Sequence, residues 1–313
     1  MSDAHALAAA IRDLPALHAK RDLQLVRRLG PVGDGDDGAL IAHGDEWIVL
    51  CGEAILPSFV AAQPRAAGAS AVVTNVSDVR AMGGRPLAIL DMLVSPDDAH
   101  AELVLEGIAW AAELLGVEVV GGHLTIGGPA SLSATCTGIA RHPLRATAAR
   151  PGDVLLGAFC LEGRYMGDDT DFFTSLRDRA PERLRTDGEA LVEVAEAGLC
   201  HAARDVSMPG AAGSLLQLLE AAGCGAVLDV DRLPRPEGVC AERWLRSFPS
   251  FGFLLAATPE HAGAARDVFT RRGLACEPCG HFDDSRTLDL QFGAERATVW
   301  DLAIAPLTGL GGG

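Results

Sequence analysis

The feature that most constrains the fold is a polar helix start followed by a glycine pair. The segment reads Asn-Val-Ser-Asp-Val-Arg-Ala-Met-Gly-Gly-Arg-Pro and begins at Asn75. Asn75, Ser77 and Asp78 predict the first turn of a short helix, which Gly83 and Gly84 end. A helix N-terminus presents free N–H groups and the positive end of the dipole, and glycine lets the backbone approach a ligand closely. The segment is therefore interpreted either as a phosphate or carboxylate site or as an ordinary capped helix.

A second unusual segment is the glycine-rich loop of residues 33–38, which reads Gly-Asp-Gly-Asp-Asp-Gly. Carboxylates this close repel one another, so a folded chain needs a reason to hold them together. One reason is a solvated turn, where salt screens the repulsion. The other is a divalent metal, since Mg²⁺ binds through one or two carboxylates together with substrate phosphates. Asp36 and Asp37 are the candidate ligands in this loop.

Three rival motifs fit the loop less well. The pattern G-x-G-x-x-G runs from Gly33 to Gly38, but a dinucleotide site needs a following helix, and residues 39–43 and 47–50 predict a β-hairpin. An EF-hand requires Asp or Asn where Gly38 stands, and the chain contains no P-loop motif. Lys20 is the only lysine, whereas P-loop and protein-kinase mechanisms place a lysine on the phosphates. A bound nucleotide would therefore need metal-bound carboxylates, backbone amides and arginine.

A third glycine-rich feature follows a short apolar run. Residues 117–120 predict a buried strand, and Gly121, Gly122 and His123 predict the turn after it. The turn either connects two strands or faces a phosphate.

The composition is that of a globular protein. The chain has 313 residues, 49% of them apolar and 22% charged, with a formal net charge of -16. The length allows two domains, and the Ala-Arg-Pro-Gly-Asp turn at 149–153 places the expected boundary between 1–150 and 151–313. The negative charge argues against nucleic-acid and anionic-membrane partners. No apolar run is long enough to span a bilayer and no signal-peptide pattern is visible, so a cytoplasmic location is expected.

The eight cysteines are expected to behave mostly as small buried apolar residues. Cys276 and Cys279 form a C-x-x-C pair, but a structural zinc site needs a second pair of ligands at suitable spacing.

Helices and strands alternate along most of the chain. Strands are expected at 131–139, 154–157, 226–229, 253–256, 277–282 and 287–290, and helices at 99–115, 188–197, 210–222 and 259–272.

Two segments of the second half carry open alternatives. Arg204 and Asp205 begin the run Arg-Asp-Val-Ser-Met-Pro-Gly, which predicts either a capped helix start or a second anion-facing helix N-terminus. The aromatic run from Phe248 to Phe253 is interpreted as core packing or as an edge that stacks on a substrate.

Taken together, these segments resemble the aminoimidazole ribonucleotide (AIR) synthase-related superfamily. Its members include thiamine-monophosphate kinase, selenophosphate synthase and the hydrogenase-maturation carbamoyl dehydratase. The resemblance covers most of the chain and is closest to an uncharacterised AIR synthase-related subgroup. It rests on five motifs in order: Gly-Asp-Asp at 35–37, Asn-x-Ser-Asp with Ala-Met-Gly-Gly at 75–84, Gly-Gly-His at 121–123, Ala-Arg-Pro-Gly-Asp at 149–153 and Asp-Val-Ser at 205–207.

The resemblance implies a two-domain α/β (α+β) fold of the PurM-like type. The N-terminal domain would bind ATP and Mg²⁺ and form a β-barrel at a homodimer interface, and the C-terminal α/β sandwich domain would bind a small-molecule acceptor. It also implies site residues. Asp36, Asp37 and Asp78 would hold Mg²⁺, and Asp205 would face the second substrate or a further metal. Arg204 is expected to serve catalysis with Asp205, and Arg204 or Arg80 would supply the positive charge that lysine cannot. Residues near ATP would be Asn75, Ser77, Gly83, Gly84, Gly121, Gly122 and His123.

Departures from the family pattern affect the expected activity. The kinases carry an aspartate on the strand where this chain has Cys51, Gly52 and Glu53, and Met208 replaces another of their carboxylates. No cysteine precedes the acidic loop, which argues against selenophosphate synthesis. The leading hypothesis is an ATP- and Mg²⁺-dependent kinase or synthase that activates an oxygen of a small metabolite. The alternative is a nucleotide-binding or scaffold subunit without turnover, and a nicotinamide-dependent oxidoreductase follows far behind.

Overall fold

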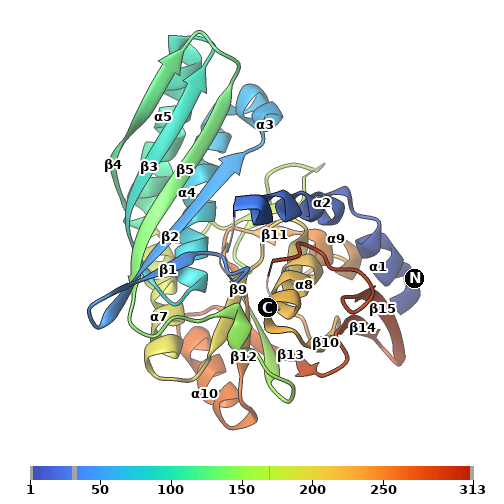
Figure 1. Ribbon diagram of the computed structural model, residues 1–313. Coiled ribbons are helices and arrows are strands. Elements are labelled where there is room, and N and C mark those ends of the chain that lie inside the picture. Colours follow the sequence, from blue (N-terminus) through green and yellow to red (C-terminus); the bar gives the residue numbers. More distant parts are fainter. Residues whose placement is uncertain (1–2, 30–33, 169, 311–313) are drawn as a thin grey trace. The chain divides into compact units, whose positions relative to one another are not determined.

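The computed structural model describes residues 3–29, 34–168 and 170–310, so Gly33 of the acidic loop lies outside the described residues. Backbone contacts divide the chain into two compact units (Figure 1). We call Asp37–His142 with Ala180–Val192 the five-stranded unit, and Met1–Asp36 with Pro143–Arg179 and Glu193–Gly313 the seven-stranded unit. Each unit mixes helices with a β-sheet, as expected.

The five-stranded unit is built on an open sheet with the strand order β1-β2-β5-β3-β4. The predicted hairpin is confirmed, because β1 and β2 pair antiparallel around a turn at Gly44. Strands β3 and β4 are parallel and are joined by a helix, while the other neighbours are antiparallel. The strands are β1 (Ala39–His43), β2 (Glu46–Ile55), β3 (Arg85–Ser95), β4 (Glu118–Ile126) and β5 (Ser131–Ala140).

Helices α4 (Pro64–Ala81) and α5 (Asp98–Leu115) lie side by side over one face of this sheet (Figure 1). The Asp97 side chain caps α5 by accepting a 2.8 Å hydrogen bond from the His100 N–H, and Gly116 ends the helix at a φ of 71°. Shorter helices in the unit are α3 (Pro57–Ala62) and α6 (Pro181–Asp187), and α7 (Glu189–Glu196) begins in it.

The two long helices cross at a pair of glycines. A Cβ on Gly107 would lie 2.0 Å from the Arg65 carbonyl O, and a Cβ on Gly68 would lie 2.1 Å from the Val104 carbonyl O. The backbones therefore touch directly, and only glycine allows that spacing. The crossing fixes α4, the helix that carries Asp78, against α5.

The prediction that Asn75 begins a helix is wrong. Helix α4 begins eleven residues earlier at Pro64, so Asn75, Ser77 and Asp78 lie in its C-terminal half. The residues before Asn75 are mostly alanine, glycine and valine, which favour close packing of a buried helix, and Pro64 suits a first helical position. The predicted helix end at the glycine pair is confirmed, because Gly83 has a φ of 70°.

The predicted turn at Gly121, Gly122 and His123 is also wrong. All three residues lie inside β4, which continues to Ile126 because it pairs in parallel with β3 as far as Ser95. The strand lies at the edge of the sheet and its residues are exposed rather than buried. Glycine at an edge strand often marks the close approach of another group, and Gly122 fits this description below.

The seven-stranded unit contains a sheet with the order β15-β14-β10-β13-β6-β12-β9. All neighbours are antiparallel except β10 and β14. The strands are β6 (Val154–Phe159), β9 (Ala202–Asp205), β10 (Gly225–Asp229), β12 (Gly252–Ala257), β13 (Ala275–Asp283), β14 (Thr287–Phe292) and β15 (Glu295–Asp301). Strands β9 and β15 were not anticipated from the sequence.

Helix α8 (Gly210–Ala222) supplies much of the core of this unit, because Leu215, Leu216, Leu218 and Leu219 are fully buried. Helices α9 (Ala241–Arg246) and α10 (Pro259–Thr270) complete the second half of the chain. The predicted helices at 210–222 and 259–272 are therefore confirmed.

Residues 3–29 and 34–36 belong to the seven-stranded unit by their contacts. Helix α1 (Ala4–Arg12) packs on β14 and β15, and its Leu7 and Ile11 are buried in the core of the unit. The Arg12 guanidinium donates hydrogen bonds to the carbonyl oxygens of Val299 (3.0 Å) and Thr298 (2.8 Å). The two compact units are each made of separate segments of the chain. The single domain boundary expected near residue 150 stays a prediction. Helix α2 (Pro15–Ala19) and the 3-10 turns η1 (Lys20–Leu29) and η2 (Ala146–Ala148) belong to the seven-stranded unit.

A small sheet of β7 (Arg164–Tyr165), β8 (Phe172–Thr174) and β11 (Phe248–Pro249) is also part of the seven-stranded unit. Phe248 stacks on Phe172 at 5.5 Å between ring centroids, and Phe251 and Phe253 are buried edge to face at 4.9 Å. Core packing thus accounts for the aromatic run.

The edges of the five-stranded sheet and the lengths of the helices bear on two expectations, a β-barrel between two copies and the absence of a membrane span. Within the described residues the five-stranded sheet is open, with β1 and β4 at its edges, so the β-barrel expected between two copies stays a prediction. In the same described part of the chain, every helix is too short or too polar to cross a bilayer.

Candidate metal centre

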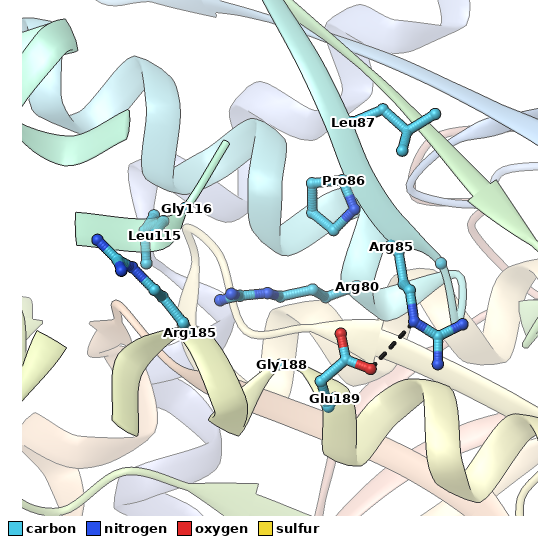
Figure 2. Close-up of a pocket in the computed structure, with 10 residues that line it drawn as sticks. Arg80, Arg85, Pro86, Leu87, Leu115, Gly116, Arg185, Gly188 and Glu189 are labelled. Carbon is cyan, nitrogen blue, oxygen red and sulfur yellow. Dashed lines mark hydrogen bonds and ion pairs between the residues drawn. The ribbon is translucent and has the colours of Figure 1, made fainter. Parts of the chain in front are cut away.

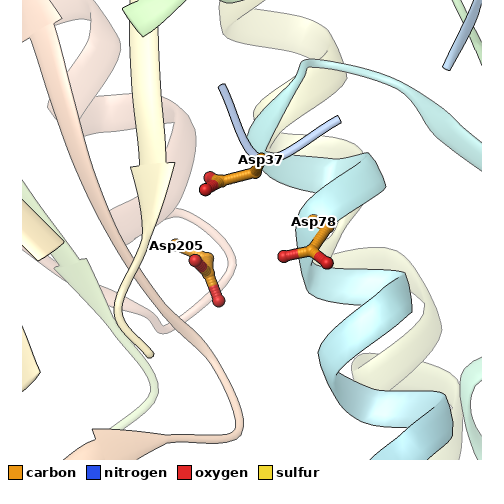
Figure 3. Close-up of side chains that lie close together, drawn as sticks. All are labelled: Asp37, Asp78 and Asp205. Atoms are coloured by element: carbon orange, nitrogen blue, oxygen red, sulfur yellow. The ribbon is translucent and has the colours of Figure 1, made fainter. Parts of the chain in front are cut away.

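Two carboxylates that lie far apart in the sequence meet in the five-stranded unit. Asp37 lies just before β1 and Asp78 lies near the end of α4, and their carboxylate oxygens come within 4.8 Å (Figure 3). Asp78 is 7% exposed and Asp37 is half-buried. Two anions held this close in a partly buried place repel one another unless positive charge is near. We call these two side chains the carboxylate pair.

The end of helix α4 makes the carboxylate pair more suited to a cation than to an anion. Asp78 lies in the last turn, where the helix dipole places its negative pole, so the backbone does not stabilise a carboxylate there. This overturns the expectation of an anion-facing helix N-terminus at Asn75. A divalent cation would be stabilised by both carboxylates and by the negative pole of the helix.

Cys51 and Asn75 lie together beside this end of α4. The Cys51 thiol donates to the Asn75 carbonyl O at 3.3 Å, and the Asn75 amide Nδ2 donates to the Ala71 carbonyl O at 2.8 Å. The thiol's hydrogen bonding with Cys136, its burial and the nearby Asp78 charge all raise the pKa of Cys51, so it stays a neutral thiol. Asn75 is fully buried and its amide is used within the helix, so its contact with a nucleotide stays a prediction. Glu53 is exposed on β2.

The residues that follow Asp78 shape the chain rather than offer charge. Ser77 is partly exposed on α4. Gly83 and Gly84 donate backbone hydrogen bonds to the carbonyls of Arg80 (2.8 Å) and Val79 (3.0 Å), which closes the end of the helix. A Cβ on Gly84 would lie 3.0 Å from the Val79 carbonyl O, so a larger residue would disturb that ending.

Gly122 makes room for a buried carboxylate that was not predicted from the sequence. Asp91 on β3 lies in register with Gly122 on β4, and a Cβ on Gly122 would lie 2.4 Å from the Asp91 Oδ1. Asp91 is 7% exposed, and burial raises the pKa of its carboxyl above the ordinary value. His123, the next residue of β4, pairs with Met92 and is exposed. A lone acid in the apolar run Ala-Ile-Leu-Asp-Met-Leu was the available signal for Asp91.

Replacing Asp91 with asparagine is expected to raise the thermal unfolding midpoint by about 2–4 °C at pH 8. The pKa of Asp91 is higher in the folded chain than in the unfolded chain, where it is about 3.9. The stability that Asp91 contributes is therefore fully present at pH values below the unfolded-state pKa, and it is lost as the pH rises through the folded-state pKa. The gain from asparagine should therefore shrink at pH 5. Calorimetry at both pH values tests this, with the exposed Asp45→Asn as control, and an equal gain at both would contradict it.

Asp36 and Arg204 belong to the seven-stranded unit and hold its loop in place. The Asp36 Oδ1 accepts a 2.6 Å hydrogen bond from the Ala146 N–H. The Arg204 guanidinium donates to the Gly35 carbonyl O at 2.8 Å and to the Gln217 Oε1 at 3.2 Å, and only 7% of Arg204 is exposed. Both side chains therefore position the acidic loop in this structure.

Asp205 ends strand β9 in the seven-stranded unit and is 7% exposed. Its strand pairs with β12, where Asp205 lies opposite Phe253. The Ser207 N–H donates to the Ser214 Oγ at 3.1 Å, which ties the segment after Asp205 to helix α8. A buried carboxylate at a strand end is a suitable candidate for a ligand or catalytic group.

The C-x-x-C pair lies within a strand of the seven-stranded sheet. Cys276 and Cys279 are buried free thiols on β13, and burial raises the pKa of Cys276 to about 12. The expectation that they act as buried apolar residues is confirmed.

Two family models match the chain. The model described as AIR synthase related protein, N-terminal domain, matches residues 35–140, and the model described as AIR synthase related protein, C-terminal domain, matches residues 150–293. Uncharacterized protein sll0787 of Synechocystis sp. is 35% identical over 309 residues, with 96% of both chains covered. Uncharacterized protein MJ0640 of Methanocaldococcus jannaschii is 31% identical over 238 residues, with 75% of this chain and 74% of that protein covered.

Solved structures share the fold. PurL of Thermotoga maritima in complex with ATP has a TM-score of 0.78 at 23% identity, with 92% of this chain and 50% of that chain covered. AaThiL complexed with AMPPCP and TMP has a TM-score of 0.66 at 19% identity, with 88% and 93% covered. This chain thus spans about half the length of the PurL chain it matches. These similarities confirm the expected two-domain PurM-like fold.

Proposed function

The chain belongs to the AIR synthase-related family, and from this premise we propose that it binds ATP with Mg²⁺ and activates an oxygen of a small metabolite by phosphoryl transfer. PurL and ThiL have been solved with ATP and with an ATP analogue respectively, which supports the nucleotide part of the proposal. The metal and the assembly are argued from the geometry of this chain, and the phosphoryl transfer is argued from the family resemblance.

The carboxylate pair is the observation that carries the proposal. Its donor atoms are oxygens, the ligands that Mg²⁺ prefers, and Mg²⁺ is commonly held by one or two carboxylates while phosphates and waters fill the remaining positions. The residues present therefore fit the metal. When bound, Mg²⁺ would neutralise phosphate charge. Many other nucleotide-binding proteins place a lysine on the phosphates, but this chain has a single lysine, Lys20, outside the candidate site.

The other family residues are proposed in narrower roles. Asp205 is proposed to face the second substrate or a further metal. Arg204 is proposed to support catalysis by holding the acidic loop through its hydrogen bond to the Gly35 carbonyl. It is also proposed to supply positive charge where other nucleotide-binding proteins use lysine. Gly121, Gly122 and His123 are proposed to border the phosphate path from an exposed strand.

The direct test of turnover is a screen of small metabolites for ADP release that requires Mg²⁺ and ATP. The proposal predicts at least one acceptor whose phosphorylation accompanies stoichiometric ADP release and is lost in Asp205→Asn. ATP binding without ADP release across the whole screen would favour the alternative, a nucleotide-binding subunit without turnover. The missing carboxylates at Cys51 and Met208 are the observations that favour this alternative.

We further propose that two copies of the chain associate through the sheet face opposite α4 and α5. Strand registers place Ile41, Leu50, Leu90 and Met92 on this face, and each is 43–51% exposed. Between them β5 places the small polar residues Ser133, Thr135 and Thr137 on the same face. Large apolar side chains this exposed on a sheet face mark an interaction surface, because a face turned to water normally carries mostly polar side chains. The exposed edge strand β4 adds unpaired backbone groups next to it.

Replacing Met92 with glutamate is expected to convert the dimer to a monomer, with the dimer Kd rising at least about 100-fold because two like charges would be buried together. Light scattering after size exclusion measures this directly. The matched control is Leu103→Glu on α5, an exposed leucine of the helix side (39% exposed), which should leave the dimer intact. A wild-type monomer, or a Met92→Glu dimer, would contradict the proposal.

A further inference from the structure

A pocket of about 320 Å³ in the five-stranded unit is lined by three arginines (Figure 2). It lies where the ends of α4 and α5, the start of β3 and the junction of α6 and α7 meet. The charged residues that line it are Arg80, Arg85, Arg185 and Glu189, and all of them belong to one compact unit. The carboxylate pair does not line this pocket.

Arg80 is the central residue of the arginine pocket. It is 6% exposed, and Figure 2 shows it lying between Arg185 and the pair formed by Arg85 and Glu189. In the described part of the chain its guanidinium donates a single hydrogen bond, a long one of 3.4 Å to the Leu184 carbonyl O, although a guanidinium carries five N–H donors. Gly188 leaves the space for it, because a Cβ there would lie 2.1 Å from the Arg80 Nε.

The charges around Arg80 leave positive charge in excess. Glu189 is paired with Arg85 at 3.0 Å, and Arg185 donates at 2.6 Å to the backbone carbonyl of Glu113 rather than to a carboxylate. Asp187 and Glu189 favour the charged form of Arg80, but burial outweighs them and lowers the pKa of Arg80 to about 10. Three cations thus face two carboxylates around this pocket.

We propose that the arginine pocket binds the phosphate group of a small phosphorylated ligand. Guanidinium groups match phosphate oxygens with two parallel hydrogen bonds, and the three free oxygens of a phosphate monoester can accept from more than one arginine. A carboxylate carries one charge and would engage fewer of the donors. The volume suits a small metabolite, since ligand pockets begin at about 300 Å³. This proposal does not rest on the proposed function.

The test is calorimetric titration of inorganic phosphate into the full chain in EDTA, which removes metal from the carboxylate pair. Wild-type protein should bind phosphate, and Arg185→Gln should bind it at least about 10-fold more weakly. Arg80→Lys should also weaken binding, and its fold can be checked by circular dichroism. The matched control is Arg183→Gln, an exposed arginine on the same helix that does not line the pocket, which should bind like the wild type.

Two further arms separate the possible outcomes. Asp78→Asn should bind phosphate in EDTA as the wild type does, so failure of the metal proposal leaves this one standing. Acetate at equal ionic strength should bind at least about 10-fold more weakly than phosphate, because it makes fewer charge-assisted hydrogen bonds. Absence of phosphate binding, equal loss in Arg183→Gln and Arg185→Gln, or equal affinity for acetate would overturn the proposal.

Discussion

Replacing Asp78 with asparagine is expected to weaken ATP binding in Mg²⁺ on the order of 100-fold. The asparagine keeps the size of the side chain but removes one charge of the carboxylate pair, whose oxygens lie within 4.8 Å. Mg²⁺ would then be held by Asp37 alone, at the negative pole of helix α4. Titration calorimetry at saturating Mg²⁺ measures the change in Kd.

The control for this variant is Asp45→Asn. Asp45 lies in the exposed turn between β1 and β2. The substitution Asp45→Asn removes one carboxylate charge from the same unit, as Asp78→Asn does. It should leave the Kd for ATP within about twofold of wild type, since exposed charges contribute little. An Asp78→Asn protein that is folded and binds Mg-ATP as tightly as the control would remove Asp78 from the proposed site.

Replacing Gly107 with alanine is expected to destabilise the five-stranded unit by about 3 kcal/mol. The new Cβ would lie 2.0 Å from the Arg65 carbonyl O, a backbone atom that cannot turn aside as a flexible side chain would. Helices α4 and α5 would have to separate, and α4 carries Asp78. Metal-dependent ATP binding should weaken in parallel. Urea unfolding followed by circular dichroism measures the stability.

Gly263→Ala is the matched control for the glycine crossing. Gly263 is also inside a helix, α10, but a Cβ there would meet no atom within 4 Å. This substitution should stabilise the chain by about 0.5–1 kcal/mol, because alanine favours the helix over glycine. If both substitutions changed the free energy of unfolding by the same amount and in the same direction, the close crossing of α4 and α5 would not be the reason that residue 107 must be glycine.

Elements with a strong local signal could be predicted from the sequence. The β1–β2 hairpin has a Gly-Asp turn between apolar runs, and α5 has an aspartate cap and a glycine end. Helix α8 is mostly apolar and lies in the core of its unit, with Ser214, Gln217 and Glu220 as its buried polar residues. In each of these cases the local chemistry and the tertiary packing favour the same structure.

Other elements depend on contacts that the sequence does not display. Helix α4 begins at Pro64 because small residues pack it against α5, although Asn75 resembles a helix cap. Strand β4 continues through Gly121 and Gly122 because β3 pairs with it and Asp91 occupies the space beside Gly122. The placement of α1 on β14 and β15 joins parts of the chain nearly 290 residues apart.

The candidate site could be predicted only in part. Motif order and family resemblance singled out Asp37 and Asp78, and the structure brings these two together. Asp91 was missed as a site residue because it lies alone in the sequence between apolar neighbours, and Arg80 was named only as a possible source of positive charge, not as the residue of a separate pocket. Their burial and their partners, Gly122 and Gly188, come from chain segments that meet only in the fold.

The proposed Mg²⁺-dependent nucleotide site is tested most simply by the Kd for ATP of the wild-type protein, determined by calorimetry at saturating Mg²⁺ and again in EDTA. If two acidic side chains hold the cation against the triphosphate, binding should be at least about 10-fold tighter with Mg²⁺. Equal affinity in both conditions, or no ATP binding in either, would contradict the account.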